Sequence, residues 1–217
     1  MGTHIRHYEM TPADNILYFP NNIDIRLCPK NGMSSIKELY RIYRGHDEYV
    51  GRKYRMDCVK NYSCQFEMPF RKNSYRIAIK RDPVDRFKSA CEYILANQAK
   101  YIKSGRLNEL PSLDEELDTV LDKIEGGLFK NNHFYTQSWY MNSTHDYNLI
   151  VHIDELSQLM VFLNESSGLG LSPDQLDIWD NKTSLKMYGD VLTEQQIRRI
   201  KKLYWRDYES GWCKNEY

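Results

Sequence analysis

The chain has 217 residues, 30 of them basic and 30 acidic, so its formal net charge at pH 7 is zero. This balance argues against a general affinity for nucleic acid or for an anionic membrane surface, although it allows a local basic site for a small polyanion. The apolar share of 41% is typical of a globular chain. We therefore expect one domain over residues 1–217, with residues 1–20 as an N-terminal extension.

No apolar run approaches the roughly 18 residues of a membrane span. The polar stretch Met1–Asp14 lacks the apolar centre of a secretory signal. We therefore expect a soluble chain and favour a cytoplasmic location. The five cysteines are irregularly spaced, which indicates free thiols rather than a disulfide framework.

The first clear element is a β-like run, Ile23–Cys28, which Pro29–Gly32 interrupts. Ser34 or Ser35 can cap a helix after this break, because apolar residues follow at helical spacing. Those residues are Ile36, Leu39, Tyr40 and Tyr43. The pattern predicts a strand, a tight loop and a helix in succession.

A second strand is expected at Tyr75–Lys80, followed by a helix that Asp82 caps and that has Pro83 in its first turn. The third strand candidate is Leu149–Val151. Further helices are expected over Leu113–Ile124, Leu156–Leu163 and Thr193–Tyr208.

Strands that alternate with helices predict an α/β fold. We expect a P-loop-like, three-layer arrangement with a central, mainly parallel sheet flanked by helices. Ligands of such sheets bind beyond the carboxyl ends of the strands. The strand-to-helix junctions at Pro29 and Arg81 are therefore where chemistry is expected.

The loop at the first junction has the features of a cradle for a terminal phosphate or sulfate. Lys30 supplies a mobile cation, and Gly32 permits close approach of the backbone. Ser34 and Ser35 supply hydroxyl donors at a helix N-terminus, where the dipole adds partial positive charge. The loop is not a Walker A motif, because its lysine precedes its glycine. A plain capped turn is the alternative.

The second junction offers a guanidinium and a hydroxyl. Arg81 lies at a strand end, and Ser89 lies two helical turns further on, so both can grip one phosphate. An ion pair is the alternative role for Arg81. Arg86 can pair with Asp82 at the i, i+4 spacing.

Taken together, these stretches resemble the PAPS-dependent sulfotransferases (PAPS is 3′-phosphoadenosine-5′-phosphosulfate), and in particular their carbohydrate-acting branch. The family has a Pro-Lys-x-Gly-x-Thr/Ser loop and a later Arg-Asp-Pro-x-x-Arg-x-x-Ser-Ala segment, and both occur here in order. Three further stretches resemble later family segments: Asn131–Gln137, Tyr147–Leu156 and Asn181–Ser184. The chain departs from the family at Met33, Cys91, Phe134 and Thr136, and its late segment lacks the leading histidine.

The resemblance implies that Lys30, Asn31, Gly32, Met33, Ser34 and Ser35 hold the 5′-phosphosulfate of PAPS, and that Arg81 and Ser89 hold its 3′-phosphate. It also implies a carbohydrate acceptor and transfer without a metal. Lys30 would stabilise the leaving oxygen. For the general base we choose His133, with His46 and Glu67 as rivals.

Two other functions stay open at this point. A P-loop-type nucleotide or sugar kinase would share the layered fold, but it needs a Walker lysine and a magnesium-binding acid, neither of which we find. A non-catalytic nucleotide- or glycan-binding protein would keep Arg81 and Ser89 and could lack the base.

Overall fold

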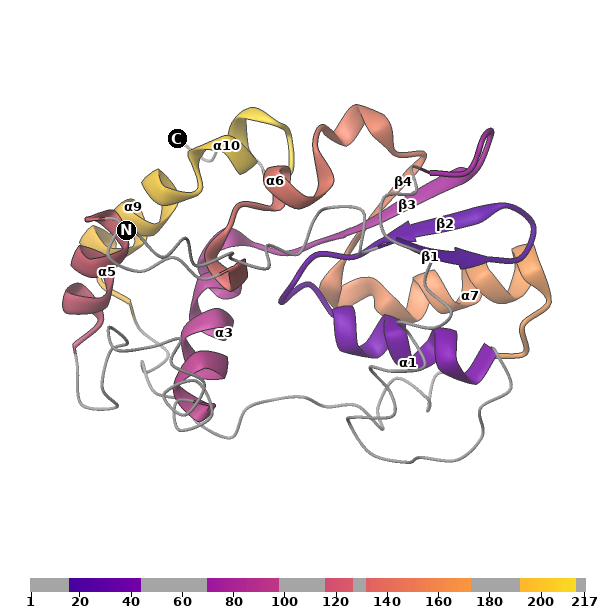
Figure 1. Ribbon diagram of the computed structural model, residues 1–217, viewed down its shortest axis with the longest axis horizontal. Helices are drawn as coiled ribbons and strands as arrows, with labels where there is room; N and C mark the ends of the chain where they lie inside the picture. Colours follow the sequence, from indigo (N-terminus) through magenta and orange to yellow (C-terminus); the bar gives the residue numbers. More distant parts are fainter. Residues whose placement is uncertain (1–15, 44–69, 98–115, 127–131, 173–191, 214–217) are drawn as a thin grey trace, which may run out of the picture.

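The computed structural model describes residues 16–43, 70–97, 116–126, 132–172 and 192–213, and at its centre lies a four-stranded sheet. Its strands lie in the order β1-β2-β3-β4 (Figure 1). They are β1 (Ile16–Phe19), β2 (Ile23–Arg26), β3 (Tyr75–Lys80) and β4 (Leu149–His152). Strand β1 is antiparallel to β2, whereas β2, β3 and β4 are parallel. The expected α/β class with a mainly parallel sheet is confirmed.

Strand β1 is an element that the sequence patterns did not reveal. It lies within residues 1–20, where we expected an extension, and it forms one edge of the sheet. The turn that joins it to β2 has Asn21 at φ 52° and Asn22 at φ 60°. Asparagine tolerates this left-handed region better than most residues, which favours a tight turn here. The amide of Ile23 closes the turn by donating to the Pro20 carbonyl over 3.2 Å.

The helices flank this sheet. The α-helices are α1 (Met33–Tyr43), α3 (Pro83–Ala96), α5 (Leu117–Glu125), α6 (Gln137–Met141), α7 (Leu156–Ser167), α9 (Glu194–Leu203) and α10 (Trp205–Glu209). Short 3₁₀ turns are η2 (Asn132–Phe134), η3 (Thr144–Asp146) and η4 (Ile153–Glu155).

Two of the expected helices differ in extent from the observed ones. The helix expected over Leu113–Ile124 is observed as α5, and residues 113–115 lie outside the described ranges. The helix expected over Thr193–Tyr208 is two helices, because Tyr204 leaves the helical conformation at φ −101° and ψ 21°. Thr193 caps α9 by accepting from the amide of Gln196.

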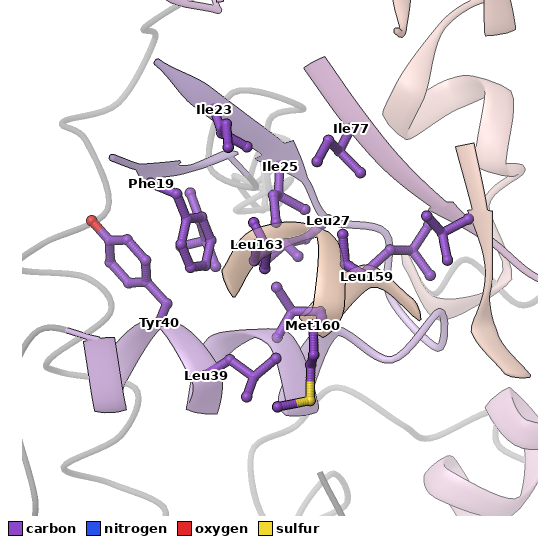
Figure 2. Packing of buried hydrophobic residues seen from close by; sticks show 14 of the residues in the cluster. Phe19, Ile23, Ile25, Leu27, Leu39, Tyr40, Ile77, Leu159, Met160 and Leu163 are labelled. Carbon is purple, nitrogen blue, oxygen red and sulfur yellow. The ribbon is translucent and has the colours of Figure 1, made fainter. Parts of the chain in front are cut away.

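The main core lies between the sheet and the helices α1 and α7, which cover one of its faces (Figures 1 and 2). Figure 2 shows Ile25 and Ile77 of the sheet above Leu39 of α1, with Leu159 and Leu163 of α7 beside them. On the opposite face Ala78 packs with Tyr140 of α6 and with Trp212. A separate apolar cluster joins α3, α5 and α9.

Because both faces of the sheet are packed, β2 is buried along its whole length and β3 over Ile77–Ile79, as is usual for central parallel strands. Within the described ranges, no helix is long and apolar enough to cross a membrane.

Candidate functional site

The carboxyl ends of the parallel strands β2, β3 and β4 lie at the same end of the sheet. Their register pairs Arg26 with Ala78 and Lys80 with His152, so the loops that follow the three strands are neighbours. A Cβ added to Gly32 would lie 3.1 Å from Cδ1 of Leu156, which follows β4. The loop after β2 therefore packs directly against the segment after β4.

The loop after β2 has two residues in the left-handed region, Lys30 at φ 70° and Gly32 at φ 72°. The left-handed conformation costs a lysine roughly 1–2 kcal/mol, whereas glycine adopts it freely. The amide of Asn31 donates to the Cys28 carbonyl over 3.1 Å, which closes the turn. This turn delivers the chain to the start of α1, where the amide of Ile36 donates to the Gly32 carbonyl over 3.1 Å.

The N-terminus of α1 has the features of an anion site. Met33, Ser34 and Ser35 form its first turn, so neither serine is the N-cap that the sequence suggested; the helix starts earlier, and the Gly32 carbonyl accepts its first hydrogen bond from Ile36. The first amides of a helix have no partner within the helix. The two serines are half-buried, and the Met33 side chain packs against the main core. Met33 therefore contributes packing through its side chain, and only its backbone amide is placed to meet an anion.

The side chain of Asn31 is turned into the protein. It is 1% exposed, and its Nδ2 donates to the Ile79 carbonyl over 2.8 Å and to Oε1 of Gln137 over 2.6 Å. These bonds tie the loop after β2 to the end of β3. We expected Asn31 to bind the donor, and in this arrangement its side chain braces the loop instead.

Arg81 joins the two junctions. Its Nη1 donates to the carbonyl oxygen of Lys30 over 3.1 Å. Burial lowers the pKa of Arg81, and the nearby carboxylates of Asp85, Asp154 and Glu92 oppose that shift. Because this guanidinium is half-buried, it would form a stronger charge-assisted hydrogen bond with a bound anion than an exposed guanidinium would.

Lys30, Tyr93 and His133 form a second contact group at the same end of the sheet. The ammonium of Lys30 lies 4.6 Å from the ring centroid of Tyr93, within the range of a cation–π interaction. The imidazole of His133 stacks on the same ring with a centroid distance of 4.7 Å. The sequence-predicted cation and base are therefore brought together through Tyr93.

The environment of His133 keeps its imidazole neutral. Burial lowers the pKa of His133 to about 3, and the positive charges of Lys30 and Arg86 add to this shift. A neutral imidazole is the form that accepts a proton, but so low a pKa makes it a weak acceptor. An anion that neutralised Lys30 would raise the pKa of His133 and strengthen it as a base.

Arg86 does not pair with Asp82, although the i, i+4 spacing suggested that it can. Its side chain is fully buried, and its Nε donates to the Pro29 carbonyl over 3.0 Å. Asp82 instead caps α3, as expected, because its Oδ1 accepts from the amides of Val84 and Asp85 over 2.8 and 3.1 Å. The Asp82 carboxylate is thus occupied by the amides of the cap. The guanidinium of Arg86 instead lies in the interior, over the ring of Tyr204.

Ser89 is half-buried on α3, one turn before Tyr93 on the same helix face. The two rival bases, His46 and Glu67, lie outside the described residues. Cys28, just before the loop, is not a nucleophile at neutral pH, because burial raises the pKa of its thiol to about 11.

Sequence reasoning gave no role to three residues of this region: Tyr93, Gln137 and Asp207. The helical spacing of Tyr93 from Ser89 could have placed Tyr93 near the second junction. A carboxylate flanked by aromatic residues, as Asp207 is in Tyr204–Tyr208, could have indicated a buried acid. Gln137 lies inside one of the family-like segments, but nothing in the sequence indicates what its amide contacts.

Comparisons with models of protein families, with curated proteins and with solved structures found no match to this chain.

Proposed function

We propose that this protein is a PAPS-dependent sulfotransferase that acts on a hydroxyl of a carbohydrate, with a P-loop-like arrangement of the loop after β2. The observation that carries the proposal is the hydrogen bond from Arg81 to the Lys30 carbonyl. It brings together the two anion-binding motifs, which lie 51 positions apart in the sequence. A donor with phosphate groups at the 3′ and 5′ positions of one ribose needs two such sites side by side.

The charges around the loop support this proposal. Lys30 lies in the loop after β2, and Arg81 and Arg86 donate to carbonyl oxygens of that loop. Arg86 is fully buried and holds the Pro29 carbonyl, so it supplies a fixed positive charge behind the loop. Lys30 and Arg81 are half-buried and can reach a ligand.

The reaction would be an in-line transfer of the sulfuryl group. The acceptor oxygen forms a bond to sulfur, and the bond between sulfur and the phosphate oxygen breaks, which releases adenosine 3′,5′-bisphosphate. The Lys30 ammonium would stabilise the negative charge that develops on the leaving oxygen. The acceptor proton would pass to the imidazole of His133, whose basicity rises once a bound anion offsets the charge of Lys30.

A non-catalytic nucleotide-binding protein is the second candidate, and the low pKa of His133 favours it. Such a protein would need the two phosphate sites but no proton acceptor. A P-loop-type nucleotide or sugar kinase is the third candidate.

One assay separates these functions. Purified protein is incubated with sulfur-labelled PAPS and a panel of glycans, with EDTA present, and the Lys30→Ala variant is run in parallel. We expect labelled sulfate on at least one glycan with the wild type and almost none with the variant. Binding of adenosine 3′,5′-bisphosphate without transfer to any acceptor would favour the binding protein. Phosphoryl transfer from ATP that requires Mg²⁺ would favour the kinase.

A further inference from the structure

The carboxylate of Asp207 is buried and holds the start of α6. Asp207 belongs to α10 and is 0% exposed. Its Oδ2 accepts from the amide of Gln137 over 2.9 Å, and its Oδ1 accepts from the amide of Ser138 over 2.8 Å. A buried carboxylate is stable only when its oxygens are satisfied in this way, so these contacts fix α6 against the C-terminal helix.

The side chain of Gln137, also 0% exposed, connects that carboxylate to both strand-to-helix junctions. Its Oε1 accepts from Nδ2 of Asn31 over 2.6 Å and from the amide of Arg81 over 2.9 Å. Its Nε2 donates to the Arg81 carbonyl over 2.9 Å. One amide thus contacts the loop after β2 and both backbone groups of the residue after β3.

The amide of Gln137 can satisfy these partners in one orientation only. Rotation by 180° would place its NH₂ against the Arg81 amide and the Asn31 NH₂, so that donors would face donors. The Asp207 carboxylate, whose Oδ2 lies 3.5 Å from Nε2, favours the observed orientation because it attracts the NH₂ group. Asp207 therefore reinforces the orientation of Gln137 that its partners at the junctions already select.

We propose that Gln137 and Asp207 are positioning residues that set the separation of the two anion-binding junctions, so that a ligand with two phosphates is held as one unit. This inference rests on the proposed function. Neither residue touches the ligand in this scheme: Gln137 acts through Asn31 and Arg81, and Asp207 acts through Gln137.

The test compares two nucleotides, adenosine 3′,5′-bisphosphate, which needs both junctions, and adenosine 5′-monophosphate, which needs one. Dissociation constants are measured by calorimetry for the wild type and for Gln137→Met, which keeps the side-chain length but removes the amide. Asp207→Asn is the second variant: it keeps the size of the side chain but leaves only one oxygen to accept from the amides of Gln137 and Ser138, so circular dichroism checks that each variant is folded.

The chain offers a matched control in Asn164. Its amide also grips both backbone groups of one residue, because Oδ1 accepts from the Leu171 amide over 2.7 Å and Nδ2 donates to the Leu171 carbonyl over 2.6 Å. This pair of hydrogen bonds lies near the end of α7, more than two helical turns beyond Leu156. Asn164→Leu therefore removes an equivalent pair of hydrogen bonds without touching the junctions.

We expect the preference of the wild type for the bisphosphate over the monophosphate to fall about tenfold in Gln137→Met, because the three hydrogen bonds that position Asn31 and Arg81 are lost. Asp207→Asn should reduce the preference less. Asn164→Leu should lower thermal stability and leave the preference unchanged.

An unchanged preference in folded Gln137→Met and Asp207→Asn would overturn the positioning role while leaving the proposed function intact. An equal loss in Asn164→Leu would overturn it too, because general loosening would then explain the effect. If the wild type bound neither nucleotide, the proposed function itself would fall, and the positioning role with it.

Discussion

The imidazole of His133 stacks on the ring of Tyr93 at an interplanar angle of 27°, and the Lys30 ammonium lies over that same ring. One aromatic side chain of α3 therefore contacts both the proposed base and the proposed charge-stabilising cation. These two residues come from elements more than a hundred positions apart, the loop after β2 and η2.

This relationship predicts that the ring of Tyr93 matters more than its hydroxyl. Tyr93→Leu removes both ring contacts and should lower kcat/KM about tenfold, since a partly buried cation–π contact is worth about 1–2 kcal/mol. Tyr93→Phe should keep most of the activity. The measurement is steady-state kinetics with PAPS. Tyr75→Leu is the control, because Tyr75 stacks on Phe162 at 5.3 Å in a comparable geometry on other elements. A larger loss in Tyr93→Phe than in Tyr93→Leu would contradict the prediction.

The low pKa of His133 predicts how stability changes with pH. The folded state holds the imidazole neutral down to about pH 3, whereas the unfolded chain takes up the proton near pH 6.5. Between these values the unfolded state binds more protons, so the free energy of unfolding rises with pH and falls on acidification. The contribution of this one group is at most about 1.4 kcal/mol per pH unit.

Urea unfolding at several pH values between 4 and 7 measures this slope. His133→Gln should flatten it, while His145→Gln, on the exposed turn η3, should leave it as in the wild type. A His133→Gln slope equal to that of the wild type would mean that the imidazole is not held neutral by the fold.

Arg81 is predicted to carry much of the nucleotide affinity. Arg81→Ala should weaken binding of adenosine 3′,5′-bisphosphate by about 2–4 kcal/mol, because a desolvated charge-assisted contact is lost. Calorimetry measures the change, and circular dichroism checks that the variant is folded. Arg206→Ala removes an equal charge from the exposed surface of α10 and should change the affinity little. Unchanged affinity in folded Arg81→Ala would remove this residue from the site.

Lys30 is predicted to act on the transition state. Lys30→Ala should lower kcat by about 10²–10³-fold and raise the PAPS KM much less, because the ammonium meets charge that develops only during transfer. Lys30→Arg should restore little activity, since a planar guanidinium cannot occupy the place of a compact ammonium. If only the KM for PAPS rose, Lys30 would be a binding residue and another donor would stabilise the leaving oxygen.

The backbone of Lys30 offers an independent check of the same residue. At φ 70° its conformation is strained for a side chain with a Cβ but not for glycine. Lys30→Gly should therefore be more stable than Lys30→Ala by about 1 kcal/mol, while both variants show the same fall in kcat. Stability is measured by urea unfolding. Lower stability in Lys30→Gly would show that the conformation costs nothing here.

The local patterns of the sequence were sufficient for three of the four strands and for the start of α3, whereas α1 begins at Met33, before the serines that were expected to cap it. The strands at Ile23, Tyr75 and Leu149 appear where apolar runs are bounded by polar residues or prolines, and Asp82 caps α3 as its position before Pro83 suggested. Strand β1 was missed because four apolar residues next to a proline carry little periodicity. Its pairing with β2 depends on a turn built by two asparagines.

The sequence indicated the residues that we propose to face a ligand, but not the residues that support them. Lys30 and Arg81 occur in local motifs, and the structure brings them into contact. The bracing by Gln137 depends on contacts between distant segments, which no local pattern encodes. Arg86 illustrates the same limit. Its i, i+4 spacing from Asp82 suggested an ion pair, but its side chain is buried and contacts Pro29 and Tyr204 instead.

The long separations within the Asn31–Gln137–Asp207 chain have a consequence for how the protein is made. Asn31 and Gln137 lie 106 positions apart, and Gln137 and Asp207 lie 70 apart. Closing such loops costs chain entropy, as it also does for the pairing of β3 with β4, where Ile77 lies opposite Leu149. On the ribosome, β1 to β4 emerge well before residue 207, and the core between the sheet, α1 and α7 can assemble first. The two junctions would therefore reach their final separation only once residue 207 has been synthesised and α10 has docked against α6.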